Sequence, residues 1–356
     1  MSPARALAFE ILTAVERGGY ASDLLAARAL PLDSRDAGLA SEIVLGVLRN
    51  RAQLDFLIEH YSGKPAARLD DAVRQALRMA IYQLRYLERI PAHAAVSESV
   101  ELIKRARKRS AAGFANAVLR KVDRAPVAWP SRAVELSHPA WLLERWERRY
   151  GPESASAIAR ANLQVPETWC NPATGRIQDL GAQSIVPLLR LSPGQSFLDL
   201  CAAPGNKTAQ AVAAGVRPIA CDIHHHRLAS LKPLGIDLVL LDATQPLPFR
   251  RRFDRILIDA PCSGTGTLAH NPEIKWRLQP SHLAELQARQ AALLDQGRRA
   301  LAPGGLLVYA TCSLEPEENE DVIASVPPPM VVETMRRLPG CDPGDGFFAA
   351  VITSDR

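Results

Sequence analysis

Apolar residues in the first third of the chain recur at the three- and four-residue spacing of amphipathic helices. Leu7, Ile11, Leu12 and Val15 form one such stripe, and prolines separate the helical stretches that follow. The same spacing predicts helices over residues 54–59, 70–87, 93–107 and 114–121. An all-α bundle over residues 1–125 is therefore predicted.

The pattern changes near residue 196, where short apolar runs begin to alternate with helical stretches. This alternation predicts an α/β domain with a parallel, doubly wound sheet. Strands are expected at residues 197–200, 218–222, 238–242, 255–259, 306–310, 331–335 and 347–352, and the longest helix at 282–301. Between the halves we expect a helix at 141–162 and an irregular stretch at 165–175. The expected parts are a helical domain (1–125), a linker with a helical segment (126–175) and an α/β domain (176–356).

Charge is distributed unevenly along the 356 residues, although the whole chain carries only +5. Residues 1–150 hold 24 basic and 17 acidic side chains, a net of +7, and the remainder is slightly acidic. A basic domain beside a near-neutral one fits an anionic polymer, nucleic acid first. Surface charge for solubility alone explains the imbalance equally well.

Composition narrows the class of protein further. With 47% apolar and 23% charged residues the chain is not a disordered one. It contains no run of about 18 apolar residues, so no membrane span is expected. Its six cysteines are scattered without a C-x-x-C pair, which disfavours a zinc knuckle and predicts reduced thiols in the cytoplasm.

A turn of small residues follows Asp199 and Leu200, the last two residues of the first predicted strand. Such a turn between a strand and a helix lets a ligand approach the backbone and the free N–H groups of the helix. The residues expected to bind a cofactor there are Cys201, Ala202, Ala203, Pro204, Gly205, Asn206 and Lys207. The next two strands also end in acids, Asp222 and Asp242, of the kind that holds ribose hydroxyls.

The turn does not fit either common phosphate-binding motif. Cys201 and Asn206 occupy the positions where a P-loop needs glycine, and no G-x-G-x-x-G is present. We therefore expect a nucleoside ligand without a pyrophosphate, such as S-adenosylmethionine.

Two further strand ends carry cysteines. Asp259-Ala260-Pro261-Cys262-Ser263 follows the fourth strand and Thr311-Cys312-Ser313 follows the fifth. A lone cysteine is most often a small core residue. Two at the carboxyl ends of central strands, where an open α/β sheet forms its ligand crevice, favour a thiolate nucleophile.

These segments together resemble the RNA cytosine-C5 methyltransferase family, of the Sun or Fmu type. The resemblance rests on residues 199–208, 259–263 and 309–313 and extends to 271–276, 316–319 and 344–348. The first 125 residues resemble the NusB-type RNA-binding fold, notably at 94–100 and 114–120. Together, the two resemblances imply a NusB-like helical bundle followed by a Rossmann-like, S-adenosylmethionine-dependent methyltransferase domain.

The resemblance also implies a reaction. In it, Cys312 attacks carbon 6 of a cytosine and Cys262 serves the release step. From its position at the adjacent strand end, Asp259 is expected to hydrogen-bond the base at N3 and to contribute to cofactor binding. The expected substrate is RNA, specifically 16S ribosomal RNA, and the expected enzyme is a monomer without a metal. Two departures stand out: Asn206 replaces the family's usual glycine, and only about 33 residues separate Asn162 from Ser196, where relatives carry a small α/β subdomain.

A basic run at residues 104–109 is a candidate phosphate contact, and a solvated helix end is the alternative. The run contributes Lys104, Arg105, Arg107, Lys108 and Arg109. Three successive histidines at 224–226 point in different directions on a regular element, so we expect them to open a helix rather than bind a metal. Two other functions remain open: an RNA-binding regulator with an inactive methyltransferase body, and a methyltransferase of small molecules or proteins.

Overall fold

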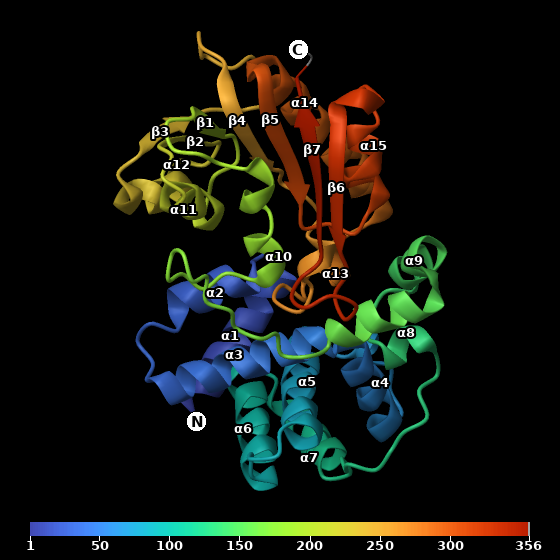
Figure 1. Ribbon diagram of the computed structural model, residues 1–356. Coiled ribbons are helices and arrows are strands. Elements are labelled where there is room, and N and C mark those ends of the chain that lie inside the picture. The colour runs from blue at the N-terminus through green and yellow to red at the C-terminus, as the bar shows by residue number, and fades with distance from the viewer. Residues whose placement is uncertain (355–356) are drawn as a thin grey trace. The chain divides into compact units, whose positions relative to one another are not determined.

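The computed structural model of the protein describes residues 1–354, and the chain divides into two compact units (Figure 1). The helical unit comprises residues 1–165 together with 268–277. The sheet unit comprises residues 166–267 and the chain from Leu278 onward. The domain boundaries expected at residues 125 and 175 stay a prediction.

The body of the helical unit is the all-α bundle that the apolar spacing predicted. Its helices are α1 (Pro3–Glu16), α2 (Ala21–Arg28), α3 (Ser34–Arg49), α4 (Arg51–Ser62), α5 (Asp71–Tyr86), α6 (Ala92–Arg105) and α7 (Ala112–Leu119). Helix α5 packs against α1, α3, α4, α6 and α7. The stripe of Ile11, Leu12 and Val15 is buried in this core, as are Leu77 and Ile81 of α5. Burial of these apolar faces stabilises the bundle.

The joint after the bundle contains α8 (Arg132–Glu135) and α9 (Ala140–Ala161). The single helix predicted at 141–162 is wrong in one respect, because α9 is broken at Gly151. Gly151 has φ 82° and ψ 161°, and Pro152 begins the second half. Glycine reaches a positive φ without a steric penalty, and proline lacks the N–H that a continuous helix would use.

The segment 268–277 packs within the helical unit although it follows strands of the sheet unit in sequence. It ends in the short helix α13 (Ile274–Arg277). Its buried Lys275 donates to the carbonyl of Arg49 at 2.9 Å, and the Trp276 indole N–H donates to the carbonyl of Leu48 at 2.7 Å. These contacts to the end of α3 fix the segment.

The sheet unit is built on a seven-stranded sheet with the order β3-β2-β1-β4-β5-β7-β6. The strands are β1 (Phe197–Asp199), β2 (Pro218–Asp222), β3 (Asp237–Leu240), β4 (Phe253–Asp259), β5 (Leu301–Thr311), β6 (Val331–Arg337) and β7 (Phe347–Thr353). The expectation of a wholly parallel sheet is wrong at β7, which is antiparallel to both β5 and β6. A hairpin-like return from β6 places β7 between β5 and β6. An antiparallel edge on a mostly parallel sheet is common in α/β folds.

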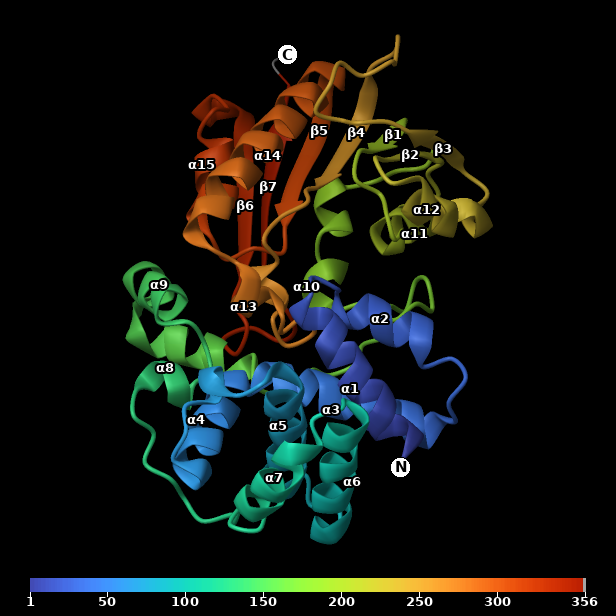
Figure 2. The same cartoon turned by 180° about the vertical axis from the view of Figure 1, so that it is seen from behind.

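Both faces of the sheet are covered. Along β4, Ile256 and Ile258 face one core and Leu257 the other, the alternation expected of a strand. The helices of this unit are α10 (Leu180–Gln183), α11 (Asn206–Ala213), α12 (His225–Leu228), α14 (Pro280–Ala300) and α15 (Glu320–Ile323). Figure 2 shows α14 and α15 over one face, and the 3₁₀ turn Val186–Leu189 with α11 covers the other. Because β1, β2, β4 and β5 run parallel to one another, their carboxyl ends lie along one edge of the sheet.

Candidate active site

The turn between β1 and α11 has the form expected of a ligand-binding loop. Gly205 takes φ 102°, and a Cβ there would lie 2.9 Å from Leu231 Cγ. Glycine is thus required for backbone conformation and for space. Asn206 begins α11, and its side chain is hydrogen-bonded to Arg176 (3.3 Å) and the Ile177 carbonyl (3.2 Å). The residue that replaces the family's usual glycine is therefore helical, so it demands no left-handed backbone.

Two of the strand-end acids are tied into this loop. Asp222, at the end of β2, accepts hydrogen bonds from the backbone N–H groups of Ala203 (3.2 Å) and His224 (2.8 Å). Asp199 is 1% exposed and accepts from the Thr208 hydroxyl at 2.7 Å. Burial, with the nearby charge of Asp259, raises the pKa of Asp199 to about 7 against the opposing hydrogen bond from Thr208.

The third acid behaves differently. β3 ends at Leu240, two residues before the expected strand end, and Asp242 lies on an exposed turn. Its carboxylate accepts from the Thr244 hydroxyl (2.7 Å) and the Thr244 N–H (3.0 Å), which lower the pKa of Asp242. This is the geometry of an Asx turn. A turn role accounts for Asp242 without a ligand.

Cys201 lies among the acids at the sheet edge. Burial and then the charges of Asp199, Asp259 and Asp222 raise the pKa of its thiol well above the ordinary value. A thiol held in its protonated form is a poor nucleophile. Cys201 is therefore part of the wall of the loop and is not an attacking group.

The two cysteines singled out by sequence meet at the ends of β4 and β5. These strands are parallel neighbours with Asp259 opposite Ala310, so the following turns run side by side. The sulfur atoms of Cys262 and Cys312 are 3.4 Å apart, far beyond the roughly 2.05 Å of a disulfide. The hydrogen bond between the sulfurs, together with burial, raises the pKa of Cys262 well above the ordinary value. The two thiols are therefore direct hydrogen-bonding neighbours.

Lys207 joins the β1–α11 turn to Asp259 at the end of β4. Its ammonium donates to Asp259 Oδ2 at 2.7 Å and lies 5.1 Å from the centre of the Phe347 ring. Burial lowers the pKa of Lys207, but the charges of Asp259 and Cys312 outweigh it and the net shift is upward. Lys207 is thus a cation that acts on both Asp259 and Cys312.

A buried carboxylate behind the cysteines was missed by sequence reasoning. Glu318 accepts from the Ser263 N–H (2.7 Å), from Gln290 Nε2 (3.0 Å) and from the hydroxyls of Ser263 and Ser313. It therefore ties the turn after β4 to the turn after β5. The signal was the serine that follows each cysteine, together with the acidic segment 316–319.

Asn319 reinforces this link. Its amide oxygen accepts from the Thr311 hydroxyl at 2.5 Å, and its amide N–H donates to the Ser313 carbonyl at 2.9 Å. Gly266 N–H also donates to the Cys312 carbonyl at 2.9 Å. The backbone around Cys312 is thus held from both sides.

The remaining sequence candidates lie away from the cysteines in the chain. Lys104 and Arg105 form ion pairs with Glu101, and Lys108 pairs with Asp70 at 2.7 Å. The three histidines open α12 as expected.

Over residues 1–354 no group of His, Cys, Asp or Glu is arranged to hold a metal ion. Within the same range, none of the helices has the length and apolar character needed to cross a membrane.

Two family models match the chain. Residues 2–124 match the NusB family, and residues 186–327 match the model described as 16S rRNA methyltransferase RsmB/F.

Two relatives that match over nearly their whole length carry the same name. The chain is 32% identical to ribosomal RNA small subunit methyltransferase B of Klebsiella pneumoniae, and the match covers 96% of each protein. The protein of the same name from Citrobacter koseri is also 32% identical over 95% of each. The first alignment runs over 414 positions although this chain has 356 residues, so that relative carries segments that this chain lacks.

Solved structures agree on the fold. The crystal structure of PH0851 superposes with a TM-score of 0.79 over 99% of both chains, at 21% identity. A methyltransferase homologue from Pyrococcus horikoshii has a TM-score of 0.51 and 25% identity, covering 64% of this chain and all of its own. The helical bundle followed by a methyltransferase-type α/β domain is therefore confirmed.

Proposed function

The chain belongs to the RsmB/F family of 16S rRNA methyltransferases, and from that premise we propose that it methylates carbon 5 of a cytosine in ribosomal RNA. The observation that carries the proposal is the pair of sulfur atoms 3.4 Å apart beside the Lys207–Asp259 ion pair. A second thiol next to a nucleophilic one suits a reaction that must both form and release a covalent adduct. A small-molecule methyltransferase has no need of this pair.

The cofactor we propose is S-adenosylmethionine, which supplies a methyl group as an electrophile when bound. The β1–α11 turn fits a nucleoside ligand because Gly205 allows a tight backbone turn that other residues would not, and the N–H groups of α11 face the turn. Asp222, fixed by Ala203 and His224, offers its carboxylate to the ribose hydroxyls. Residues 201–207 form the wall of the proposed site. Asp242 stays a proposed contact through Oδ2, because Oδ1 accepts both hydrogen bonds from Thr244.

We assign the attack to Cys312. Carbon 5 of cytosine is a weak nucleophile, and a bond from the Cys312 sulfur to carbon 6 turns carbon 5 into an enamine-like centre that accepts a methyl group. The ammonium of Lys207 interacts electrostatically with Cys312 and so places a positive charge near the attacking sulfur. Asp259, positioned by Lys207, offers a hydrogen bond to the base edge, which orients the ring during attack.

We assign the release step to Cys262. After methylation, the hydrogen on carbon 5 must leave as a proton while the carbon 5–carbon 6 double bond re-forms and the sulfur–carbon 6 bond breaks. Cys262 lies next to Cys312, so its sulfur is within reach of the same ring. To accept the carbon 5 proton, Cys262 must first release its own proton to solvent, and the raised pKa makes the resulting thiolate a strong base.

The RNA target we propose is small-subunit ribosomal RNA, following the names of the relatives. The reacting base must leave its stack to reach the sheet edge, as in other base-modifying enzymes. We propose the helical unit as the principal RNA-binding part, with the run at 104–109 as one phosphate contact. Arg107 and Arg109 are its exposed members outside the ion pairs to Glu101 and Asp70.

Bisulfite sequencing of ribosomal RNA from cells with and without the gene tests this proposal. We expect at least one small-subunit cytosine to be protected from conversion only when the gene is present. In the strain without the gene, the wild-type gene should restore this protection and the Cys312→Ala gene should not. Identical conversion in both strains would contradict cytosine-C5 methylation of that RNA.

A further inference from the structure

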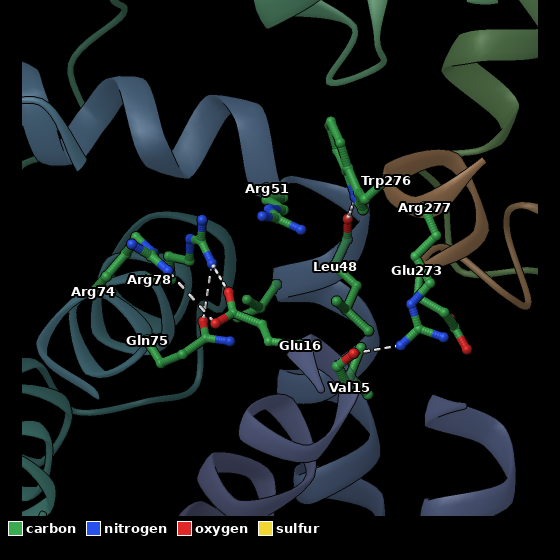
Figure 3. A pocket seen from close by; sticks show the side chains of 11 residues that line it. Val15, Glu16, Leu48, Arg51, Arg74, Gln75, Arg78, Glu273, Trp276 and Arg277 are labelled. Atoms are coloured by element: carbon green, nitrogen blue, oxygen red, sulfur yellow. Dashed lines mark hydrogen bonds and ion pairs between the residues drawn. The ribbon is translucent and has the colours of Figure 1, made fainter. Parts of the chain in front are cut away.

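A cavity of about 340 Å³ lies within the helical unit, away from the cysteine pair in the chain. Its walls come from the ends of α1 and α3, from α4 and α5, and from the segment 273–277. The lining side chains are Val15, Glu16, Val47, Leu48, Arg51, Arg74, Gln75, Arg78, Glu273, Trp276 and Arg277 (Figure 3). Four arginines against two glutamates make it cationic, and its volume is that of a small-ligand site.

Three of the four arginines already have partners. Arg78 is held by Asp55 (2.6 and 2.8 Å) and Glu16 (2.8 Å), and Arg74 pairs with Asp71 at 2.6 Å. Arg277 donates to main-chain carbonyls, including that of Gly18 at 3.3 Å. These guanidinium groups build the walls of the cavity.

Arg51 is different. Within residues 1–354 no carboxylate lies at ion-pair distance from its guanidinium, and its ring contact is Trp276, 5.6 Å away. Burial and then the charge of Arg78 lower the pKa of Arg51 against weaker help from Asp55 and Glu16. Figure 3 shows Arg51 between Arg78 and Trp276 at the top of the cavity. A partly buried cation crowded by other cations is stabilised by an added anion.

The unsatisfied atoms suggest the chemistry of that anion. The buried Nε of Arg74 has no hydrogen-bond acceptor, and the buried Oε2 of Glu273 has no donor. A nucleotide supplies both, through phosphate oxygens and through a hydroxyl or amino group. Trp276 beside Arg51 adds an aromatic and cationic surface of the kind that nucleobases contact. An acidic peptide would satisfy the arginines but would leave the Glu273 oxygen facing another carboxylate.

We infer that this cavity binds a phosphate group of one nucleotide of the RNA strand, with Arg51 as its charged ligand. The inference rests on the proposed RNA substrate and adds a specific contact in the helical unit. Because planar guanidinium groups bind phosphate oxygens in pairs, Arg51 is suited to a phosphodiester.

The test measures binding of the full-length protein to transcribed small-subunit rRNA at several salt concentrations, without cofactor. We expect Arg51→Gln to weaken binding about tenfold at 0.1 M salt, a size in keeping with one charge-assisted hydrogen-bonded contact. It should also reduce the slope of log affinity against log salt by nearly one. Arg35→Gln, which removes an exposed arginine of the same unit, is the matched control and should resemble the wild type. Equal affinity and slope for wild type, Arg51→Gln and Arg35→Gln would overturn the inference.

A second variant and a second probe complete the test. Arg51→Lys keeps the charge but loses the paired hydrogen bonds, so we expect weaker RNA binding with an unchanged salt slope. Unchanged RNA affinity of Arg51→Lys would count against the inference, even if Arg51→Gln fails to fold. Cytidine 5′-monophosphate tests for a free nucleotide. If Arg51→Gln abolishes stabilisation by that nucleotide but leaves RNA binding intact, the RNA assignment is overturned. Repeating the measurement with Cys312→Ala separates this result from any failure of the proposed methylation.

Discussion

Lys207 Nζ and Asp259 Oδ2 are 2.7 Å apart, so the first turn of α11 is ion-paired with the end of β4. The loop proposed for the cofactor and the acid proposed to hold the base therefore share one contact. The lysine side chain is only 12% exposed, which shields this pair from solvent. We expect this contact to hold the loop of residues 201–207 and Asp259 in a fixed position relative to each other.

Lys207→Met should break the link between this loop and Asp259. Without the ammonium, Asp259 loses its partner and Cys312 loses a nearby positive charge, so we expect the single-turnover methylation rate to fall about 100-fold. Cofactor affinity by calorimetry should change less, because residues 201–206 remain. Lys207→Arg preserves the charge and should retain most of the rate. A Lys207→Met enzyme with the wild-type rate would remove Lys207 from the mechanism.

Asp222 offers a test of the cofactor site. Asp222→Ala removes the carboxylate that accepts from Ala203 and is proposed to hold the ribose, so S-adenosylmethionine binding should weaken by about 1–3 kcal/mol. Asp222→Asn keeps one carbonyl oxygen and should lose less. Asp237→Ala, an exposed acid at the start of β3, is the control. Calorimetry that gives the same affinity for Asp222→Ala and Asp237→Ala would contradict the proposed site.

The raised pKa of Asp199 predicts a pH effect on stability. An unfolded aspartate titrates near pH 3.9, whereas Asp199 in the folded chain titrates near 7. Between these values the folded chain keeps a proton that the unfolded chain has released, so this residue makes stability fall as pH rises from about 4 to 7. Asp199→Asn cannot ionise, and the wild type should lose about 1.4 kcal/mol relative to it per pH unit within that window. Denaturant unfolding of both proteins at pH 5, 6 and 7 measures this; parallel stability profiles would refute it.

Glu318 should be needed for the shape of the two turns that carry Cys262 and Cys312. Replacing it with glutamine puts an N–H donor where Ser263 or Gln290 now donates, leaving buried donors unpaired. We expect Glu318→Gln to lower the free energy of unfolding by about 2–3 kcal/mol and to slow adduct formation. Glu285→Gln, on the exposed side of α14, should do neither. Wild-type stability and rate in Glu318→Gln would show that the two turns hold their geometry without this carboxylate.

Much of the architecture could be predicted because its signals are local. The helical spacing of apolar residues predicted the bundle. β4 and β5 are consecutive parallel strands with Asp259 opposite Ala310, and this register brings the cysteine-bearing turns together. The direction of β7 depends on how the chain returns from β6, which no local pattern specifies. Asp242 was assigned to the end of a strand, but its own hydrogen bonds to Thr244 place it in a turn instead.

Long-range contacts account for what the sequence did not reveal. The buried Lys275 looks like a surface residue in sequence, and only its packing against the end of α3 explains its burial. Glu318 likewise looks like one member of an acidic surface segment. Its role depends on two serines 55 and 5 residues away in the chain, which come together only in the folded sheet unit.

The roles of the two cysteines are the central claim, and one denaturing gel tests them most directly. Each alanine variant is incubated with small-subunit rRNA and S-adenosylmethionine and run under conditions that preserve covalent bonds. We predict a protein–RNA band for Cys262→Ala, because attack and methylation proceed while release is blocked, and none for Cys312→Ala, which has no attacking sulfur. The reverse pattern would show that Cys262 attacks, and intact methylation by both variants without any adduct would contradict the covalent mechanism.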